Sequence, residues 1–96
     1  MSDATPTGPW RTFLTEHYLP GWTAAQLADA AGRVREAVGE LERSGQPVRF
    51  QHVTIVATDE AFLCVIEASS EELIRLACAT ARTPFERISA AHVEQR

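Results

Sequence analysis

The side chains that could bind a metal ion or move a proton are few in this chain of 96 residues, and they are scattered along it. Imidazole, thiolate and carboxylate groups are the ligands that nickel and zinc take in proteins. The chain offers Glu16, His17, His52, Cys64, Glu67, Cys78 and His92. It has no CxxC, HxH or HxxxH motif, no glycine-rich phosphate loop and no GxSxG motif. Any site therefore has to be assembled by the fold.

The strands that must position these groups are indicated by composition. Residues 10–18 are rich in aromatic and β-branched residues, and a Pro-Gly pair follows them. Residues 48–57 and 61–68 are two apolar segments with the short polar turn 58–60 between them, which predicts a β-hairpin. Residues 86–93 are predicted as a short last strand.

Two helices are predicted between the strands. Thr23 followed by Gln26 is a capping box that starts the first helix, and Gly45 is placed to end it. Its apolar stripe is Leu27, Ala31, Val34, Val38 and Leu41. Ser69 followed by Glu72 predicts a second capping box. The inner stripe of the second helix is Leu73, Ile74, Ala77 and Ala81.

The element order βαββαβ predicts an α+β, ferredoxin-like fold. Right-handed crossovers give a four-stranded antiparallel sheet with strand order 4-1-3-2 and both helices on one face. Residues 1–9 are polar and rich in proline and glycine, which predicts a disordered lead-in. Residues 10–96 are predicted to form a single ferredoxin-like domain, since a chain of this length builds one core.

Composition excludes several classes of partner. The net charge of −4, with nine basic residues, argues against binding to nucleic acid or to an anionic membrane surface. No apolar run approaches the roughly 20 residues of a membrane span, and the N-terminus lacks the pattern of a signal peptide. Two cysteines are too few for a disulfide framework, so they are expected to be small buried residues. We expect a cytoplasmic protein.

Alternation along the hairpin assigns its side chains to two faces. With Thr54 opposite Val65, His52 lies opposite Glu67. The face predicted to point away from the helices carries Phe50, His52, Thr54, Val56, Leu63, Val65 and Glu67. The helix-facing side carries Val53, Ile55, Phe62, Cys64 and Ile66. The first face is too apolar to be left in water, so we expect a homodimer that packs through this helix-free sheet face.

The pair His52 and Glu67 is the strongest candidate site, because the hairpin brings the two together as cross-strand neighbours. Three interpretations stay open: a His–Glu hydrogen bond, a metal or ligand contact completed by a second subunit, and a general base. Glu16 and Tyr18 are further candidate ligand-binding residues if they share the helix-free face. His17 is expected to be exposed or near a loop, far from His92, so a three-histidine site in one protomer is not expected.

Four segments together resemble a known family. They are FLTEHYLPGWT at 13–23, VRF at 48–50, CVIEAS at 64–69 and PFERI at 84–88. The chain is similar over residues 11–93 to a family of small bacterial proteins, common in actinobacteria, whose domain has no assigned function. One group in that family is described as nickel-binding, with a ferredoxin-like fold and a dimeric state. The resemblance therefore implies nickel, or another divalent transition metal, as a cofactor.

Three functions follow from these observations. The first is a small, soluble, dimeric metal- or ligand-binding protein with its site on the helix-free face, for which His52 and Glu67 are the predicted metal ligands. The alternative is a cofactor-free enzyme of the lyase, isomerase or cyclase type, using the same two residues on a small metabolite. A third is a module that only associates. The sequence leaves open whether the protein is an enzyme.

Overall fold

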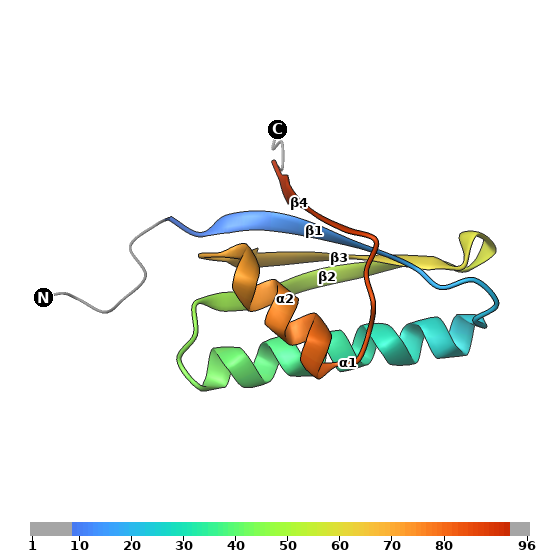
Figure 1. Ribbon diagram of the computed structural model, residues 1–96, viewed down its shortest axis with the longest axis horizontal. Helices are drawn as coiled ribbons and strands as arrows, with labels where there is room; N and C mark the ends of the chain where they lie inside the picture. The colour runs from blue at the N-terminus through green and yellow to red at the C-terminus, as the bar shows by residue number, and fades with distance from the viewer. Residues whose placement is uncertain (1–8, 93–96) are drawn as a thin grey trace, which may run out of the picture.

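The computed structural model describes residues 9–92, so most of the predicted lead-in, residues 1–8, lies outside the described part. The elements are β1 (Arg11–Tyr18), α1 (Ala24–Arg43), β2 (Val48–Val56), the short 3₁₀ turn η1 (Ala57–Asp59), β3 (Ala61–Ala68), α2 (Glu71–Thr80) and β4 (Arg87–Ala91). The sheet is antiparallel in the order β2-β3-β1-β4, which confirms the predicted 4-1-3-2 order. Both helices lie on one side of this sheet (Figure 1), as the ferredoxin-like fold requires.

The core lies between the sheet and the helices. β1 contributes Phe13 to it, and β3 contributes Phe62, Cys64 and Ile66, which have no exposed area. The predicted stripe of α1 is buried except for its half-buried last member, Leu41. In α2 the residues Ile74, Ala77 and Cys78 are buried. The alternation of β3 is therefore as predicted, with every second side chain beneath the helices.

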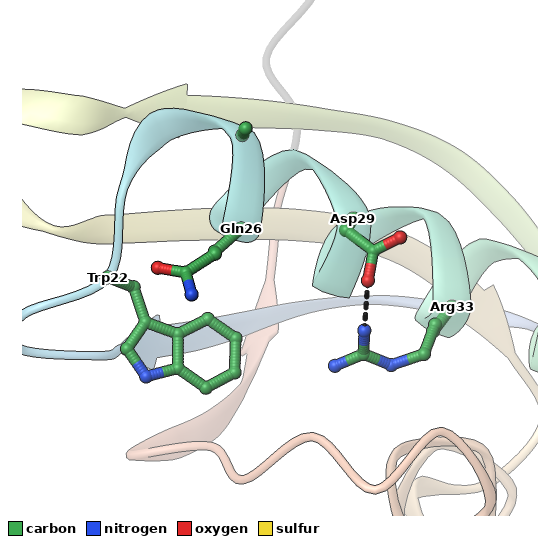
Figure 2. Close-up of a pocket in the computed structure, with 5 residues that line it drawn as sticks. Trp22, Gln26, Asp29 and Arg33 are labelled. Atoms are coloured by element: carbon green, nitrogen blue, oxygen red, sulfur yellow. Dashed lines mark hydrogen bonds and ion pairs between the residues drawn. The ribbon is translucent and has the colours of Figure 1, made fainter.

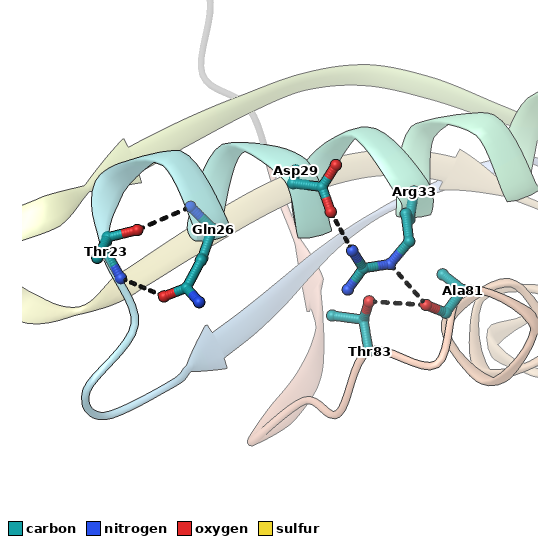
Figure 3. Close-up of polar contacts among 6 residues, drawn as sticks. All are labelled: Thr23, Gln26, Asp29, Arg33, Ala81 and Thr83. Atoms are coloured by element: carbon teal, nitrogen blue, oxygen red, sulfur yellow. Dashed lines mark hydrogen bonds and ion pairs between the residues drawn. The ribbon is translucent and has the colours of Figure 1, made fainter.

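Helix α1 begins and ends with the predicted signals. The Thr23 hydroxyl accepts a hydrogen bond from the Gln26 backbone N–H at 3.1 Å, and the Gln26 side-chain oxygen accepts one from the Thr23 N–H at 2.8 Å. Figure 3 shows this reciprocal pair. Gly45 has a φ of +97° at the other end, where hydrogen bonds from Gly45 and Gln46 to the last carbonyls form a Schellman motif.

The second predicted capping box is wrong. Helix α2 begins after Ser70 rather than Ser69, and the Ser70 side chain makes no capping hydrogen bond. Glu72 consequently lies one position too early for the reciprocal bond. The N–H of Ser69 is instead used by the carbonyl of Pro47, so a contact to the α1–β2 connection decides where α2 starts.

Arg33 holds the two helices together at the end of α2. Its Nε donates to the carbonyl of Ala81 at 3.1 Å, and its Nη1 pairs with Asp29 one turn earlier in α1. The Thr83 hydroxyl donates to the same Ala81 carbonyl at 3.1 Å (Figure 3). The carbonyl of Ala81, the C-cap residue of α2, has no partner within its own helix and therefore accepts two hydrogen bonds from these side chains.

Arg82 follows the C-cap residue of α2, which is the position that Gly45 has after α1. The hydrogen bonds from Arg82 to Ala79 and from Thr83 to Cys78 form a second Schellman motif, and Arg82 has a φ of +54°. A side chain is disfavoured in this left-handed region. We expect Arg82→Gly to raise the free energy of unfolding by about 0.5–1 kcal/mol and Gly45→Ala to lower it by about 1 kcal/mol. Urea denaturation measures both, and a loss of stability in Arg82→Gly would contradict the prediction.

The hairpin register differs from the predicted one. The turn closes in residues 57–60, with Glu60 in the left-handed region at a φ of 55°, so Thr54 pairs with Leu63 rather than Val65. The shift is two residues and leaves the predicted faces unchanged. Between Phe50 and His52 the register shifts again by one residue, as in a β-bulge. This bulge turns Phe50 to the helix side, where it packs against the core, so its predicted place on the helix-free face is wrong.

Candidate functional site

The helix-free face has an apolar centre and polar margins. Strand pairing places Leu14 of β1 beside Val65 of β3, with Leu63 two residues further along β3, and all three are half-buried. No segment within residues 9–92 covers this face, and the helices lie on the opposite side (Figure 1). The polar residues of the face are distributed around the apolar centre on all four strands.

His52 and Glu67 are not directly opposite each other, so that predicted pairing is wrong. His52 pairs with Val65, and Glu67 pairs with Arg49. The bulge inserts Gln51, whose amide nitrogen donates to the Glu67 carboxylate at 2.7 Å. His52 and Glu67 still share the face as diagonal neighbours, but the partner of Glu67 is Gln51. The described part of the hairpin therefore does not place His52 and Glu67 as a directly opposed pair.

Glu16 pairs with Leu63 and lies on the helix-free face, which fulfils the condition set for it as a candidate, and it has a cation beside it. Arg87 of β4 pairs with Glu16 across the strands, and its Nε donates to the Glu16 carboxylate at 2.9 Å. Arg87 is a residue of this face that the sequence pattern did not reveal. The PFERI segment contains this arginine, but only the β1–β4 register brings it to Glu16. Tyr18 lies two residues beyond Glu16 and is 51% exposed.

His17 is buried beneath the helices, so its predicted exposure is wrong. Its side chain is 1% exposed and stacks on the ring of Phe62 with 4.3 Å between centroids. Nδ1 lies 2.8 Å from the carbonyl of Pro84, and Nε2 lies 2.8 Å from the hydroxyl of Thr15. A carbonyl only accepts, so Nδ1 carries the proton and Nε2 accepts from Thr15. Burial lowers the pKa of His17. Both nitrogens are in use, which removes His17 from the candidate ligands.

The two cysteines are buried thiols, as predicted for Cys64 on the helix-facing side. Burial raises the pKa of Cys64 to about 12 and that of Cys78 to about 11. The thiolate is the reactive form, so we expect neither thiol to react with a disulfide reagent at pH 8 unless the protein unfolds. In contrast, both should react in urea. Rapid modification of either cysteine in the folded protein would contradict this expectation.

High pH should weaken the fold through the same thiols. The ordinary thiol pKa of 9.0 is lower than the raised values in the folded state, so the unfolded chain loses its protons first. Their contribution to stability is complete below pH 9 and falls as the pH rises above it.

Among residues 9–92, no group of three or more His, Cys, Asp and Glu side chains is arranged to hold a metal ion. His92 follows Ala91, whose partner on β1 is Thr12, and His17 lies at the other end of that strand. His17 and His92 therefore lie toward opposite ends of β1. Imidazole and carboxylate on the helix-free face are donors of the type that nickel takes, but within residues 9–92 no three of them lie close enough together to form a group.

The family assignment comes from a match over most of the chain. The family model described as "Nickel responsive protein SCO4226-like" matches residues 13–90. The chain belongs to this family. All four segments that carried the resemblance lie within the matched range, and the SCO4226-like family name supports a nickel-related role for this small protein.

A solved structure from the same family has the same fold. The crystal structure of SCO4226 from Streptomyces coelicolor A3(2) is similar, with 20% sequence identity and a TM-score of 0.67. The similarity covers 88% of this chain and 99% of that one, so it supports the ferredoxin-like fold over nearly the whole SCO4226 domain. No curated protein matches. No helix within residues 9–92 has the length and apolar character needed to cross a membrane.

Proposed function

We propose that this protein is a cytoplasmic homodimer that binds a divalent transition metal ion, nickel in the first instance, at the helix-free face. His52 and Glu67 are the proposed metal ligands, and each site takes further ligands from the second copy. Glu16 and Tyr18 are proposed as additional ligand contacts. The membership in a nickel responsive family supports the choice of metal.

One observation carries this proposal: the potential ligands of the helix-free face surround an uncovered apolar centre, yet no three of them within the described chain meet. Packing of two such faces buries Leu14, Leu63 and Val65 in each copy, which is the driving force for association. The same packing doubles the number of ligands on the face. A nickel ion bound there would be held by imidazole nitrogen and carboxylate oxygen, with Gln51 orienting Glu67.

The test is native mass spectrometry of the untagged protein, with and without added nickel and zinc chloride. A histidine tag would bind nickel by itself, so it must be absent. We expect a dimer that takes up nickel in a fixed stoichiometry. We expect His52→Ala and Glu67→Gln each to weaken binding by about tenfold or more. Glu60→Gln, in the hairpin turn, is the matched control and should bind as the unchanged protein does.

Two results would overturn the proposal. A monomer at micromolar concentration removes the second set of ligands. A dimer that binds nickel equally well in His52→Ala and Glu67→Gln places the metal elsewhere, and loss of binding in His92→Ala alone would move it to the Thr12 end of β1.

A further inference from the structure

A pocket lies on the helix side of the molecule, beside the first three turns of α1. It has a volume of about 340 Å³ and is lined by Trp22, Ala25, Gln26, Asp29 and Arg33. Figure 2 shows the indole of Trp22 at one end, the guanidinium of Arg33 at the other, and the amide of Gln26 directed toward the indole. None of these residues belongs to the helix-free face, so this pocket is separate from the proposed metal site.

The pocket is rich in hydrogen-bond donors that have no partner among residues 9–92. Gln26 uses its side-chain oxygen to cap α1, which leaves the two N–H groups of its amide available. Arg33 uses Nε on Ala81 and Nη1 on Asp29, which leaves Nη2 available. The indole nitrogen of Trp22 lies on the edge of the ring away from Arg33 (Figure 2). Asp29 also lines the pocket; one of its carboxylate oxygens is paired with Nη1 of Arg33, and the other points away from Trp22 (Figure 2).

These donors are held in place before any ligand arrives. The capping box fixes the amide of Gln26, because reversing it would place N–H groups against the N–H of Thr23. The guanidinium of Arg33 has two partners, the carbonyl of Ala81 just after α2 and the exposed carboxylate of Asp29 on α1. The side chains of the pocket therefore lose little conformational freedom when a ligand binds, which favours affinity in a small pocket. Trp22 is half-buried and packs against the core, so its ring position is set by the fold.

We propose that this pocket binds a small planar aromatic carboxylate. The ring of the ligand stacks on the indole of Trp22, and its carboxylate accepts hydrogen bonds from Gln26 and from Nη2 of Arg33. An indole ring next to a guanidinium can bind a molecule that has a flat apolar ring to stack on the indole and an anionic group to accept hydrogen bonds from the guanidinium. The volume is at the lower end of the range of about 300–1,000 Å³ that ligand pockets span, which restricts the ligand to one or two rings.

The test uses benzoate as the probe and Trp22 as the reporter. The chain has two tryptophans, so Trp10→Phe leaves Trp22 as the single indole. We expect saturable movement of the Trp22 indole N–H signal in nitrogen–proton correlation spectra, with a dissociation constant on the order of 1 mM. Benzamide lacks the charge and cyclohexanecarboxylate lacks the flat ring. Both should bind at least about fivefold more weakly.

Gln26→Glu is the decisive variant, because glutamate caps a helix as glutamine does but offers the pocket no N–H donor. We expect it to fold normally, as a thermal melt will verify, and to weaken benzoate binding at least about tenfold. Arg33→Gln should weaken binding similarly. Arg43→Gln is a control at the far end of α1, which should bind benzoate unchanged.

Several outcomes would overturn the proposal. Equal binding to Gln26→Glu and the parent protein would show that the amide is not a contact. Equal binding of inorganic phosphate and benzoate would show an anion site without an aromatic platform. A signal that moves linearly with concentration, without saturation, would show no site. The metal test reports on His52 and Glu67, so its failure leaves this proposal untouched.

Discussion

Replacement of His17 by alanine is expected to lower the free energy of unfolding by about 3 kcal/mol, a large part of the stability of a domain of this size. The change removes a buried ring that stacks on Phe62, takes away the side-chain partner of the Pro84 carbonyl, and removes one of the two partners of the Thr15 hydroxyl, the other being Cys64. The cavity and the unsatisfied groups add in the same direction. Urea denaturation followed by circular dichroism measures the loss, and a change below 1 kcal/mol would contradict the assigned geometry.

The same residue should make the fold sensitive to acid. Burial lowers the pKa of His17 in the folded protein from its ordinary value of 6.5, so the unfolded chain binds the proton first. The contribution of His17 is complete above pH 6.5 and is lost as the pH falls below it, with a slope of at most about 1.4 kcal/mol per pH unit. Glu16 on the neighbouring position of β1, paired with Arg87, faces the other side of the sheet.

His17→Phe separates this acid sensitivity from the other titrating groups. Phenylalanine keeps an aromatic ring against Phe62 but has no proton to gain, so the variant should be less stable at pH 7.5 and lose less stability than the parent between pH 7 and pH 5. The measurement is the free energy of unfolding of the parent and of His17→Phe, determined by denaturation at each pH, and the two series are compared. Parallel series would show that another group causes the acid response.

Val65→Arg is expected to convert the proposed dimer into a folded monomer. Val65 lies between Leu14 and His52 at the centre of the helix-free face. It is half-buried, so an arginine in its place can extend into water when the protein is a monomer. In the dimer the charge would be buried without a partner, which should raise the dissociation constant by at least about 100-fold. Size-exclusion chromatography with light scattering, across a dilution series, measures the effect.

Leu76→Arg is the matched control for this prediction. Leu76 is a 49% exposed apolar residue of α2, on the helix side of the molecule, so an arginine there should leave the association unchanged. If Leu76→Arg dissociates the dimer and Val65→Arg does not, the interface is on the helix side and the proposed position of the metal site falls with it.

Local interactions made much of this structure predictable. The capping box at Thr23 and the left-handed Gly45 depend on hydrogen bonds within a few residues, so the ends of α1 follow from its own sequence. The alternation of side chains along residues 61–68 showed that one side of β3 is apolar, and it predicted correctly that Phe62 and Cys64 lie in the core. The strand order followed from the handedness of the two crossovers.

Contacts between distant segments decided the rest. The bulge at Gln51 turns Phe50 toward the helix side, where it packs against the core, and gives Glu67 its partner, and no pattern within β2 indicates where the register slips. The carbonyl of Pro84 beside His17 and the guanidinium of Arg87 beside Glu16 come from residues about seventy positions later, when the segment after α2 returns along β1. Periodicity shows which side of a strand is apolar, but only the paired strands determine which polar group each polar residue meets, because that depends on register across the sheet.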